Sequence, residues 1–215
     1  TPLTSIYGAC SAMRDNFDAL PRQTHMKLLS DVCADAQWLV RMVENLLSVT
    51  RVDAATVRLS KNGTVLEELI DAVLVKFRKH YPDIDVHVEI PEEFVSIPMD
   101  AMLISQVLMN LLENAVFHAK GMENLRLRVE VKGSWAYFYV EDDGCGIPEE
   151  KLSRLFTGML DSESPTDQSR SSMGIGLSVC SAIIKAHGGE IWANKRAGGG
   201  TEVGFRLEME DENGE

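Results

Sequence analysis

The sequence predicts an α+β fold, in which a two-layer α/β sandwich follows an antiparallel helical hairpin. Two observations carry this prediction. Apolar residues recur every three or four positions over the first fifty residues, as in paired helices. From about residue 57 the pattern changes to amphipathic helices mixed with alternating strands. We therefore expect a hairpin at residues 1–56 and a sandwich domain at residues 57–215.

The hairpin prediction rests on one narrow apolar stripe in each helix, with a break near Pro21. A stripe this narrow favours a coiled-coil partner, so we expect a homodimer through the hairpin, with packing on its own domain as the alternative. The first stripe consists of Leu3, Ile6, Cys10, Met13, Phe17 and Leu20, and the second of Leu29, Val32, Cys33, Ala36, Leu39, Val40, Val43, Leu46, Leu47 and Thr50.

The elements of the sandwich each follow from a local pattern. Asp100 is a typical helix cap, the Gly133-Ser134 step predicts a hairpin turn, and the polar stretch at about 157–172 predicts a loop. The helix that begins near 174 is expected to stop at Gly188-Gly189. The expected helices cover about 65–77, 101–119 and 174–187, and the expected antiparallel strands cover about 84–90, 125–132, 135–141, 190–194 and 202–209.

Charge and cysteine content exclude several functional classes. The chain of 215 residues has a net charge of −12, with 33 acidic and 21 basic residues. Nucleic-acid binders need clustered Lys and Arg, so we expect no nucleic-acid partner. The four cysteines stand far apart, without metal-ligand or disulfide-framework spacing. No apolar run approaches the ~18 residues that span a bilayer, so we expect the chain as given to be soluble.

The helix at 101–119 carries a polar stripe opposite its apolar face. Asn110, Asn114 and His118 recur every four residues and therefore share one face, with Glu113 beside them. Amide and carboxylate oxygens are ligands that Mg²⁺ accepts when phosphates complete its shell. A solvated surface is the alternative for this stripe.

Three glycine-containing segments follow. Residues 142–147, Asp-Asp-Gly-Cys-Gly-Ile, come directly after an apolar strand, where a carboxylate can accept a hydrogen bond from an exocyclic amine. Residues 173–178 place two glycines at a helix start, whose backbone N–H groups suit a polyphosphate. Residues 198–201 separate the last two strands. Taken singly, the first and last segments are also compatible with plain turns.

The order of these segments resembles that of the ATP-binding catalytic domain of sensor histidine kinases, over residues 58–209. This domain belongs to the superfamily of gyrase, chaperone, histidine kinase and mismatch-repair ATPases. Residues 110–118 resemble the N box, 142–147 the first glycine box, Leu155-Phe156 the phenylalanine box, 174–177 the second glycine box and 198–201 the last glycine box.

The resemblance implies ATP and Mg²⁺ as cofactors. It implies that Asp142 accepts a hydrogen bond from the adenine amine and that Asn114, helped by Asn110, holds Mg²⁺. Glu113 becomes a candidate acid or base, with an ordinary solvated carboxylate as the alternative, and residues 157–172 become the lid. The other implied nucleotide-binding residues are His118, Gly144, Gly146, Ile147, Gly174, Ile175, Gly176, Leu177 and Thr201.

Two positions depart from the family pattern. Phe117 stands where the family usually has Lys or Arg near the phosphates, so the resemblance leaves that contact without a residue. Ser172 replaces a common extra glycine, a small change that leaves the lid hinge intact.

Residues 1–6, Thr-Pro-Leu-Thr-Ser-Ile, resemble the second half of the family's histidine box. By this resemblance the phosphoacceptor histidine lies upstream of Thr1, outside the chain. We therefore expect the chain to bind ATP without phosphorylating itself. Thr1 matches a position that assists dephosphorylation of the response regulator, and the hairpin becomes a partial dimerisation and phosphotransfer domain.

The family implies transfer of the γ-phosphoryl group of Mg-ATP to a histidine and then to an aspartate of a response regulator. It also implies a membrane-anchored parent protein, with this portion in the cytoplasm. Within the family, the sequence is similar to the potassium-responsive osmosensing kinases. The alternatives are a serine kinase of the anti-sigma-factor type, which would lack the hairpin, and a non-catalytic nucleotide-gated scaffold, which Phe117 favours.

Overall fold

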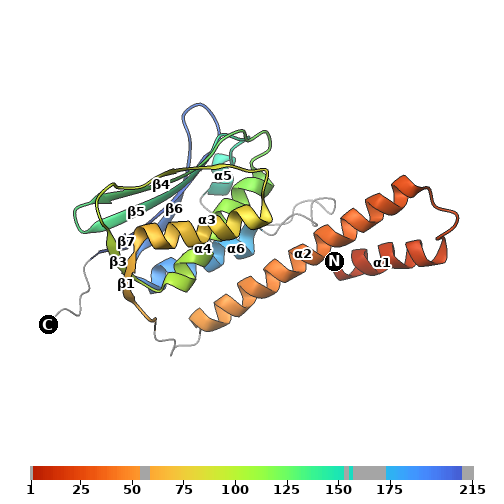
Figure 1. Cartoon of the computed structure of the whole chain (residues 1–215), viewed down its shortest axis with the longest axis horizontal. Coiled ribbons are helices and arrows are strands. Elements are labelled where there is room, and N and C mark those ends of the chain that lie inside the picture. Colours follow the sequence, from red (N-terminus) through yellow and green to blue (C-terminus); the bar gives the residue numbers. More distant parts are fainter. Residues whose placement is uncertain (1, 54–58, 153–154, 157–172, 210–215) are drawn as a thin grey trace.

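The structure is a computed structural model that describes residues 2–53, 59–152, 155–156 and 173–209. Helices α1 (Pro2–Asp15) and α2 (Arg22–Asp53) form a hairpin that extends beyond a mixed helix-and-sheet domain (Figure 1). The expected α+β class and the preceding helical hairpin are thereby confirmed. The expected domain boundary at residues 56 and 57 lies outside the described residues.

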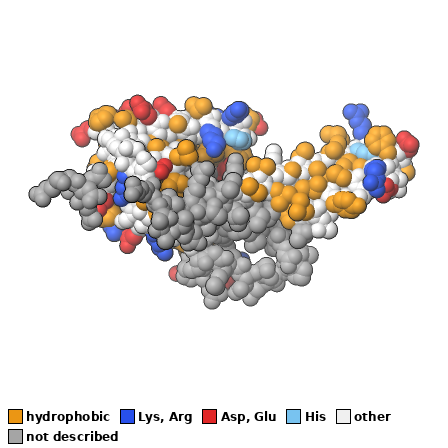
Figure 2. All heavy atoms as spheres, turned by 90° about the horizontal axis from the view of Figure 1, so that it is seen from below, with side chains coloured by type: hydrophobic (Ala, Val, Ile, Leu, Met, Phe, Trp, Pro, Cys, Tyr) orange, Lys and Arg blue, Asp and Glu red, His pale blue; other side chains and the backbone are white. Residues whose placement is uncertain are grey.

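Packing of the two hairpin helices against each other leaves part of their apolar stripe exposed. In α1, Ile6 and Met13 are half-buried, whereas Leu3 is exposed, as is Phe17 in the turn that follows α1. Figure 2 shows apolar side chains gathered along the hairpin. In α2 a second set of residues at alternating spacings of three and four is exposed, namely Met26, Leu29, Cys33, Ala36, Val40 and Val43. The hairpin therefore presents an apolar seam to solvent.

The main sheet has five strands in the order β2-β4-β5-β7-β6. Its strands are β2 (Val86–Glu89), β4 (Leu125–Lys132), β5 (Trp135–Asp142), β7 (Thr201–Glu208) and β6 (Glu190–Lys195). The expectation of an antiparallel sheet is wrong for one pair, because β2 runs parallel to β4. The chain between these strands crosses over through a long helix, and such a crossover brings the next strand back in the same direction.

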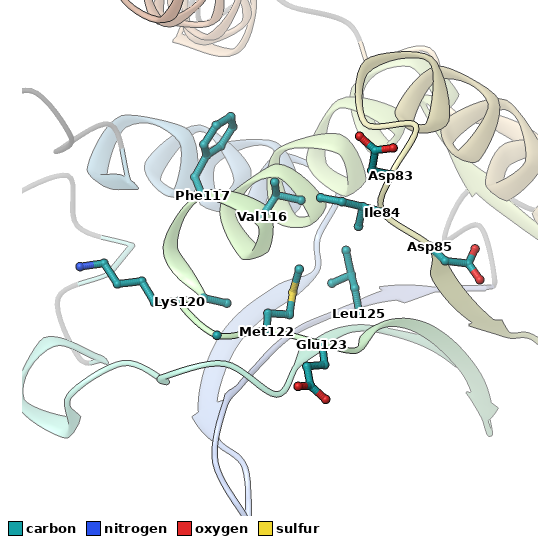
Figure 3. Close-up of a pocket in the computed structure, with 11 residues that line it drawn as sticks. Asp83, Ile84, Asp85, Val116, Phe117, Lys120, Met122, Glu123 and Leu125 are labelled. Atoms are coloured by element: carbon teal, nitrogen blue, oxygen red, sulfur yellow. The ribbon is translucent and has the colours of Figure 1, made fainter. Parts of the chain in front are cut away.

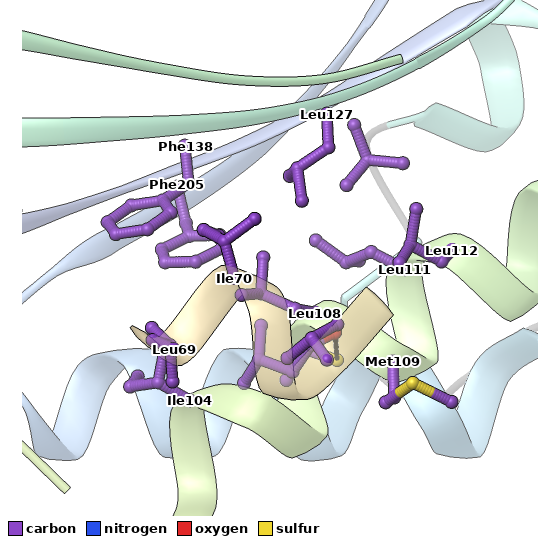
Figure 4. Close-up of a cluster of buried hydrophobic side chains, with 14 of the residues drawn as sticks. Leu69, Ile70, Ile104, Leu108, Met109, Leu111, Leu112, Leu127, Phe138 and Phe205 are labelled. Atoms are coloured by element: carbon purple, nitrogen blue, oxygen red, sulfur yellow. Dashed lines mark hydrogen bonds between the residues drawn. The ribbon is translucent and has the colours of Figure 1, made fainter. Parts of the chain in front are cut away.

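Three helices cover one face of this sheet (Figure 1): α3 (Leu66–His80), α4 (Ala101–His118) and α6 (Met173–Ala186). Their apolar faces and the inward residues of the strands form one core. In Figure 4 the stacked rings of Phe138 and Phe205, 4.6 Å apart, face Ile70 and Leu108. Burial of these side chains, at about 25 cal/mol per Å² of apolar surface, is the main force that holds the layers together.

Sequence patterns missed three short elements. Strands β1 (Asn62–Val65) and β3 (Ser96–Met99) form a separate antiparallel pair, and α5 (Glu149–Leu152) is a single turn. β1 contains Gly63 and β3 contains Pro98, two residue types that argue against a strand. Four-residue strands are too short to show a period, so neither could be predicted.

A histidine joins the ends of α4 and α6. Asp100 caps α4 as expected, because its carboxylate accepts from the backbone N–H groups of Met102 and Leu103 at 3.2 Å. His187 is buried. Its Nε2 accepts from the Asp100 N–H at 3.1 Å, and its Nδ1–H donates to the Ile183 carbonyl at 2.8 Å.

Among the helices described, none combines the length and the apolar character that a membrane crossing requires.

Candidate functional site

Asp142 ends strand β5 with its carboxylate fixed on one side. Its Oδ1 accepts from the N–H groups of Gly144 at 3.0 Å and Thr201 at 3.3 Å. No hydrogen bond to Oδ2 is found within the described ranges. Burial raises the pKa of the Asp142 carboxyl, while the two backbone hydrogen bonds act in the opposite direction. One oxygen is therefore held by the protein, and the other is available to a donor from outside.

The next residue, Asp143, has a different task. Its carboxylate accepts from the N–H groups of Glu123 and Asn124 and from the Asn124 side chain, at 2.6 to 2.9 Å. The Asn124 amide is the leading cause that lowers the pKa of Asp143 to about 2. Asp143 is thus committed to the loop after α4. Sequence reasoning gave it no role, and nothing in the sequence separates it from Asp142.

Two glycines of the 142–147 segment lie where a side chain would not fit. A Cβ on Gly144 would come within 2.7 Å of Ala119, just beyond the end of α4. Gly146 has a φ of 71°, and a Cβ there would lie 3.1 Å from the carbonyl oxygen of Gly200. Ile147 is half-buried against the core. The segment is therefore pressed between α4 and the turn at 198–200.

The polar stripe of α4 lies between the other parts of the site. Asn110 donates from Nδ2 to Cys180 Sγ of α6 at 3.8 Å. Two helical turns later, the carbonyl of His118 accepts from the thiol of Cys145 at 3.5 Å. Asn114 stands midway, about 6 Å along the helix axis from each. The stripe thus runs from α6 to the glycine segment that begins at Asp142.

Asn114 has an unsatisfied amide. Its Nδ2 is buried and has no hydrogen-bond partner in the part of the chain that the structure describes. A buried polar atom without a partner costs about 1–3 kcal/mol, so this amide calls for a partner from outside the described chain. Within the described ranges, no three Asp, Glu, His or Cys side chains cluster to hold a metal. A metal here would depend on amide oxygen and on phosphate oxygen.

Glu113 and Phe117, the residues next to Asn114 and His118 on α4, both contact Tyr81. Glu113 Oε1 accepts from the hydroxyl of Tyr81 at 3.2 Å, so it is not a freely solvated carboxylate. Phe117 packs edge-on against the ring of Tyr81, with 6.0 Å between the centroids. The Phe117 side chain is 48% exposed and lines a hollow of about 530 Å³ beside the loop that follows α4.

Figure 3 shows this hollow. Ile84, Val116, Met122 and Leu125 point toward one another, whereas the charged end of Lys120 points away. The loop from Ala119 onward forms one wall of the hollow, and on its other side it contacts Gly144. The hollow therefore adjoins the glycine segment without containing Asp142 or Asn114.

The remaining expected site residues divide into two groups. Helix α6 begins at Met173, so Gly174, Ile175, Gly176 and Leu177 form its first turns as expected, and Gly176 and Leu177 are buried. Thr201 is also buried, beside Asp142. Thr1 and the expected lid at residues 157–172 lie outside the described residues. Their roles stay predictions.

The comparisons with known proteins agree with this geometry. The family described as "Histidine kinase-, DNA gyrase B-, and HSP90-like ATPase" matches residues 99–211, more than half of the chain. The chain belongs to this family. The match covers α4, the glycine segments and the strands that carry them.

The relatives within this ATPase family are sensor proteins and histidine kinases. Sensor protein KdpD of Clostridium acetobutylicum is 32% identical over 211 residues, which make up 98% of this chain and 23% of that protein. The chain thus spans about a quarter of the length of that relative. Resemblance to sensor histidine kinases is confirmed.

Two solved structures are similar in fold. The catalytic domain of histidine kinase ThkA aligns with a TM-score of 0.59 at 28% identity, over 71% of this chain and 96% of that one. ThkA in complex with response regulator protein TrrA aligns with a TM-score of 0.75 at 24% identity, over 99% of this chain and 59% of that one. The second alignment also includes the hairpin, so both parts of the fold have a counterpart.

Proposed function

We propose that this chain is the ATP-binding catalytic region of a sensor histidine kinase. The intact enzyme transfers the γ-phosphoryl group of Mg-ATP to a histidine and then to an aspartate of a response regulator. The observation that carries the proposal is the Asp142 carboxylate, which is buried and bonded to the backbone through one oxygen only. An exocyclic amine, as in adenine, supplies the donor that the other oxygen lacks.

The residues around Asp142 have separate roles in this proposal. Gly144 and Gly146 allow the backbone to approach a flat base, and Ile147, His118 and Thr201 shape the pocket. The first turn of α6, at Gly174 to Leu177, presents its N–H groups to the phosphates. Catalysis of phosphoryl transfer consists mainly of positioning and charge neutralisation, which a fixed pocket of this kind supplies.

Asn114, assisted by Asn110, fits the role of magnesium ligand. The unsatisfied Asn114 amide is the supporting observation, since the oxygen and nitrogen of an amide exchange places by a simple flip. Mg²⁺ would neutralise charge on the phosphates when bound. Glu113, whose carboxylate accepts from the Tyr81 hydroxyl, is the candidate group to assist proton transfer from the attacking imidazole.

The partners follow from the relatives and from the exposed seam of the hairpin. Because ThkA is solved with a response regulator, we propose a response-regulator receiver domain as the phosphoryl acceptor. From the exposed apolar residues of α2, we propose that the chain forms a homodimer through the hairpin. By family resemblance we also propose a membrane-anchored parent protein with this portion in the cytoplasm. The same resemblance suggests the potassium-responsive subfamily.

A non-catalytic scaffold of the same fold is the second candidate, because Phe117 packs against Tyr81 at the position where the family has a basic residue. The two functions differ in phosphoryl transfer. A longer protein with the upstream histidine, incubated with γ-labelled ATP, becomes labelled if it is a kinase and stays unlabelled if it is a scaffold.

Calorimetric titration with Mg-ATP tests the proposed function. We expect the chain to bind ATP and Asp142→Asn to weaken binding at least ten-fold, because the new amide turns a donor toward the adenine amine. Asn114→Ala should remove most of the gain in affinity that Mg²⁺ gives. Asp85→Asn, at an exposed carboxylate elsewhere, is the control. Equal affinities for wild type and Asp142→Asn would refute the assignment of the site.

A further inference from the structure

The turn between β6 and β7 contacts Asp142 at three points. Thr201 donates its N–H to Asp142 Oδ1 at 3.3 Å. Gly200 lies so close that a Cβ there would overlap the main-chain carbonyl of Asp142. Arg196 donates from Nη1 to that same carbonyl oxygen at 2.8 Å. The carbonyl is therefore held between a glycine backbone and a guanidinium.

Arg196 is itself held in place by the turn and by its neighbour. Its N–H donates to the Gly200 carbonyl, and its own carbonyl accepts from the Gly199 N–H, both at 3.2 Å. Its Nη2 lies 3.7 Å from Glu141 Oε2. The Arg196 side chain is only 31% exposed. The backbone of Arg196 is thus fixed by the turn, and its guanidinium is oriented by Glu141.

Glu141 gives this arrangement a rigid anchor. The residue is buried, and its Oε1 accepts from Arg128 at 2.8 and 3.2 Å. Arg126 lies on its other oxygen at 3.8 Å, a contact similar in length to that of Arg196. Arg126, however, has no hydrogen bond to Asp142 among the described contacts. Of these three arginines, only Arg196 donates a hydrogen bond to Asp142 among the described contacts.

We infer that Arg196 is a positioning residue for adenine recognition, which fixes the Asp142 backbone so that the carboxylate points its unbonded oxygen at the base. The inference rests on the proposed function. With the carbonyl held by Arg196 and Oδ1 held by two N–H groups, the side chain keeps one orientation and loses little entropy on binding. The positive charge also favours the ionised carboxylate that must accept the amine, and it lowers the pKa that burial raises.

The test compares ATP with GTP binding for the full chain by calorimetry. GTP shares the triphosphate but carries a carbonyl at C6, where adenine has its amine, so it presents no donor to the Asp142 carboxylate at that position. We expect Arg196→Met to weaken ATP binding about ten-fold and to leave GTP binding unchanged, so that the preference for ATP falls by the same factor. Arg196→Lys, which keeps a charged donor, should restore most of the preference.

Arg126→Met is the matched control, because it removes a contact of similar length to Glu141 without touching Asp142. It should keep the wild-type preference, and thermal unfolding should show all variants folded. Equal losses of ATP and GTP affinity in Arg196→Met, or an effect shared with Arg126→Met, would overturn the inference. If Asp142→Asn also leaves ATP binding unchanged, the proposed function falls, and this inference falls with it.

Discussion

Two neighbouring carboxylates, Asp142 and Asp143, show how the fold separates a binding group from a structural one. Asp143 is half-buried, and its carboxylate accepts hydrogen bonds from the loop at residues 123–124, which lowers its pKa to about 2. Asp142 is buried, and burial raises its pKa. The protein thus stabilises the charge of Asp143 fully and leaves that of Asp142 partly unsatisfied, as expected for a residue that meets a ligand.

Cysteine labelling provides a residue-scale prediction. Cys10, Cys33 and Cys145 are exposed, whereas Cys180 is buried and its pKa is raised to about 12. A maleimide should therefore modify Cys10 and Cys145 and spare Cys180. Cys33 lies on the apolar seam of α2, so the proposed dimer should protect it. Mg-ATP should slow modification of Cys145 at least several-fold, because this thiol lies between the two glycines of the proposed pocket.

Mass spectrometry of peptides after timed labelling measures all four thiols in one sample. Cys10 serves as the internal control, since it lies on the hairpin and should react at the same rate with and without nucleotide. Unchanged labelling of Cys145 at saturating Mg-ATP would contradict the position proposed for the nucleotide.

At the scale of elements, the β6–β7 turn depends on one glycine more than on its neighbours. Gly200 has a φ of 87°, and a Cβ there would overlap the Asp142 carbonyl. Gly198 has a φ of 101°, but a Cβ would meet nothing within 4 Å. Gly200→Ala should therefore destabilise the fold by more than about 1 kcal/mol and weaken ATP binding, since the turn must move away from Asp142.

Gly198→Ala is the matched control for this prediction. It has the backbone strain without the overlap, so chemical denaturation should show a smaller loss of stability and calorimetry an unchanged ATP affinity. If the two variants behave alike, the close approach at Gly200 is not what sets the position of Asp142.

The contact between α4 and α6 predicts a loss of stability in acid. His187 must be neutral, because its Nε2 accepts from Asp100, and burial lowers its pKa. A histidine whose folded pKa is lowered contributes stability above its unfolded pKa of about 6.5, and this contribution is lost as the pH falls below that value. The melting temperature should thus fall between about pH 7.5 and pH 5.5.

Comparing variants at two histidines shows whether His187 causes this acid sensitivity. His187→Gln should unfold at a temperature that depends less on pH over the same interval, while His87→Gln, at an exposed position, should keep the wild-type dependence. An identical pH dependence for His187→Gln and wild type would show that other groups cause the effect.

The sequence predicted the long elements and the composition of the site, for physical reasons. Helices α3, α4 and α6 have enough turns to show a period, and β4 and β5 alternate clearly. The short pair β1 and β3 has no such pattern. The parallel pairing of β2 depends on how the chain returns to the sheet, which no local pattern records.

Within the site, side-chain type indicated Asp142, Asn114 and the glycines. The roles of Arg196, Asp143 and His187 could not be predicted, because each depends on contacts between segments far apart in the sequence. Phe117 could be identified as a departure from the family pattern, but its packing on Tyr81 needed the structure.

At the scale of the whole molecule, the exposed seam of α2 predicts self-association. Leu29 and Val40 lie on this seam, where a charge would be desolvated in a coiled-coil interface. We expect the chain to be a dimer in analytical ultracentrifugation, and Leu29→Glu with Val40→Glu to make it a monomer. Val75→Glu, at an exposed apolar residue of α3, should leave the dimer intact.

A wild-type chain that stays monomeric at high concentration would contradict the dimer, and ATP binding by the monomeric variant would show that the sandwich functions separately from the seam. This comparison tests whether the sandwich domain binds nucleotide independently of self-association through the hairpin.

A crystal structure with Mg²⁺ and a non-hydrolysable ATP analogue tests the central claim most directly. We predict that the adenine amine lies within hydrogen-bond distance of Asp142 Oδ2, and that Asn114 contacts the metal on the same nucleotide. A nucleotide bound elsewhere, or one that reaches Asp142 without approaching Asn114, would contradict the proposed site.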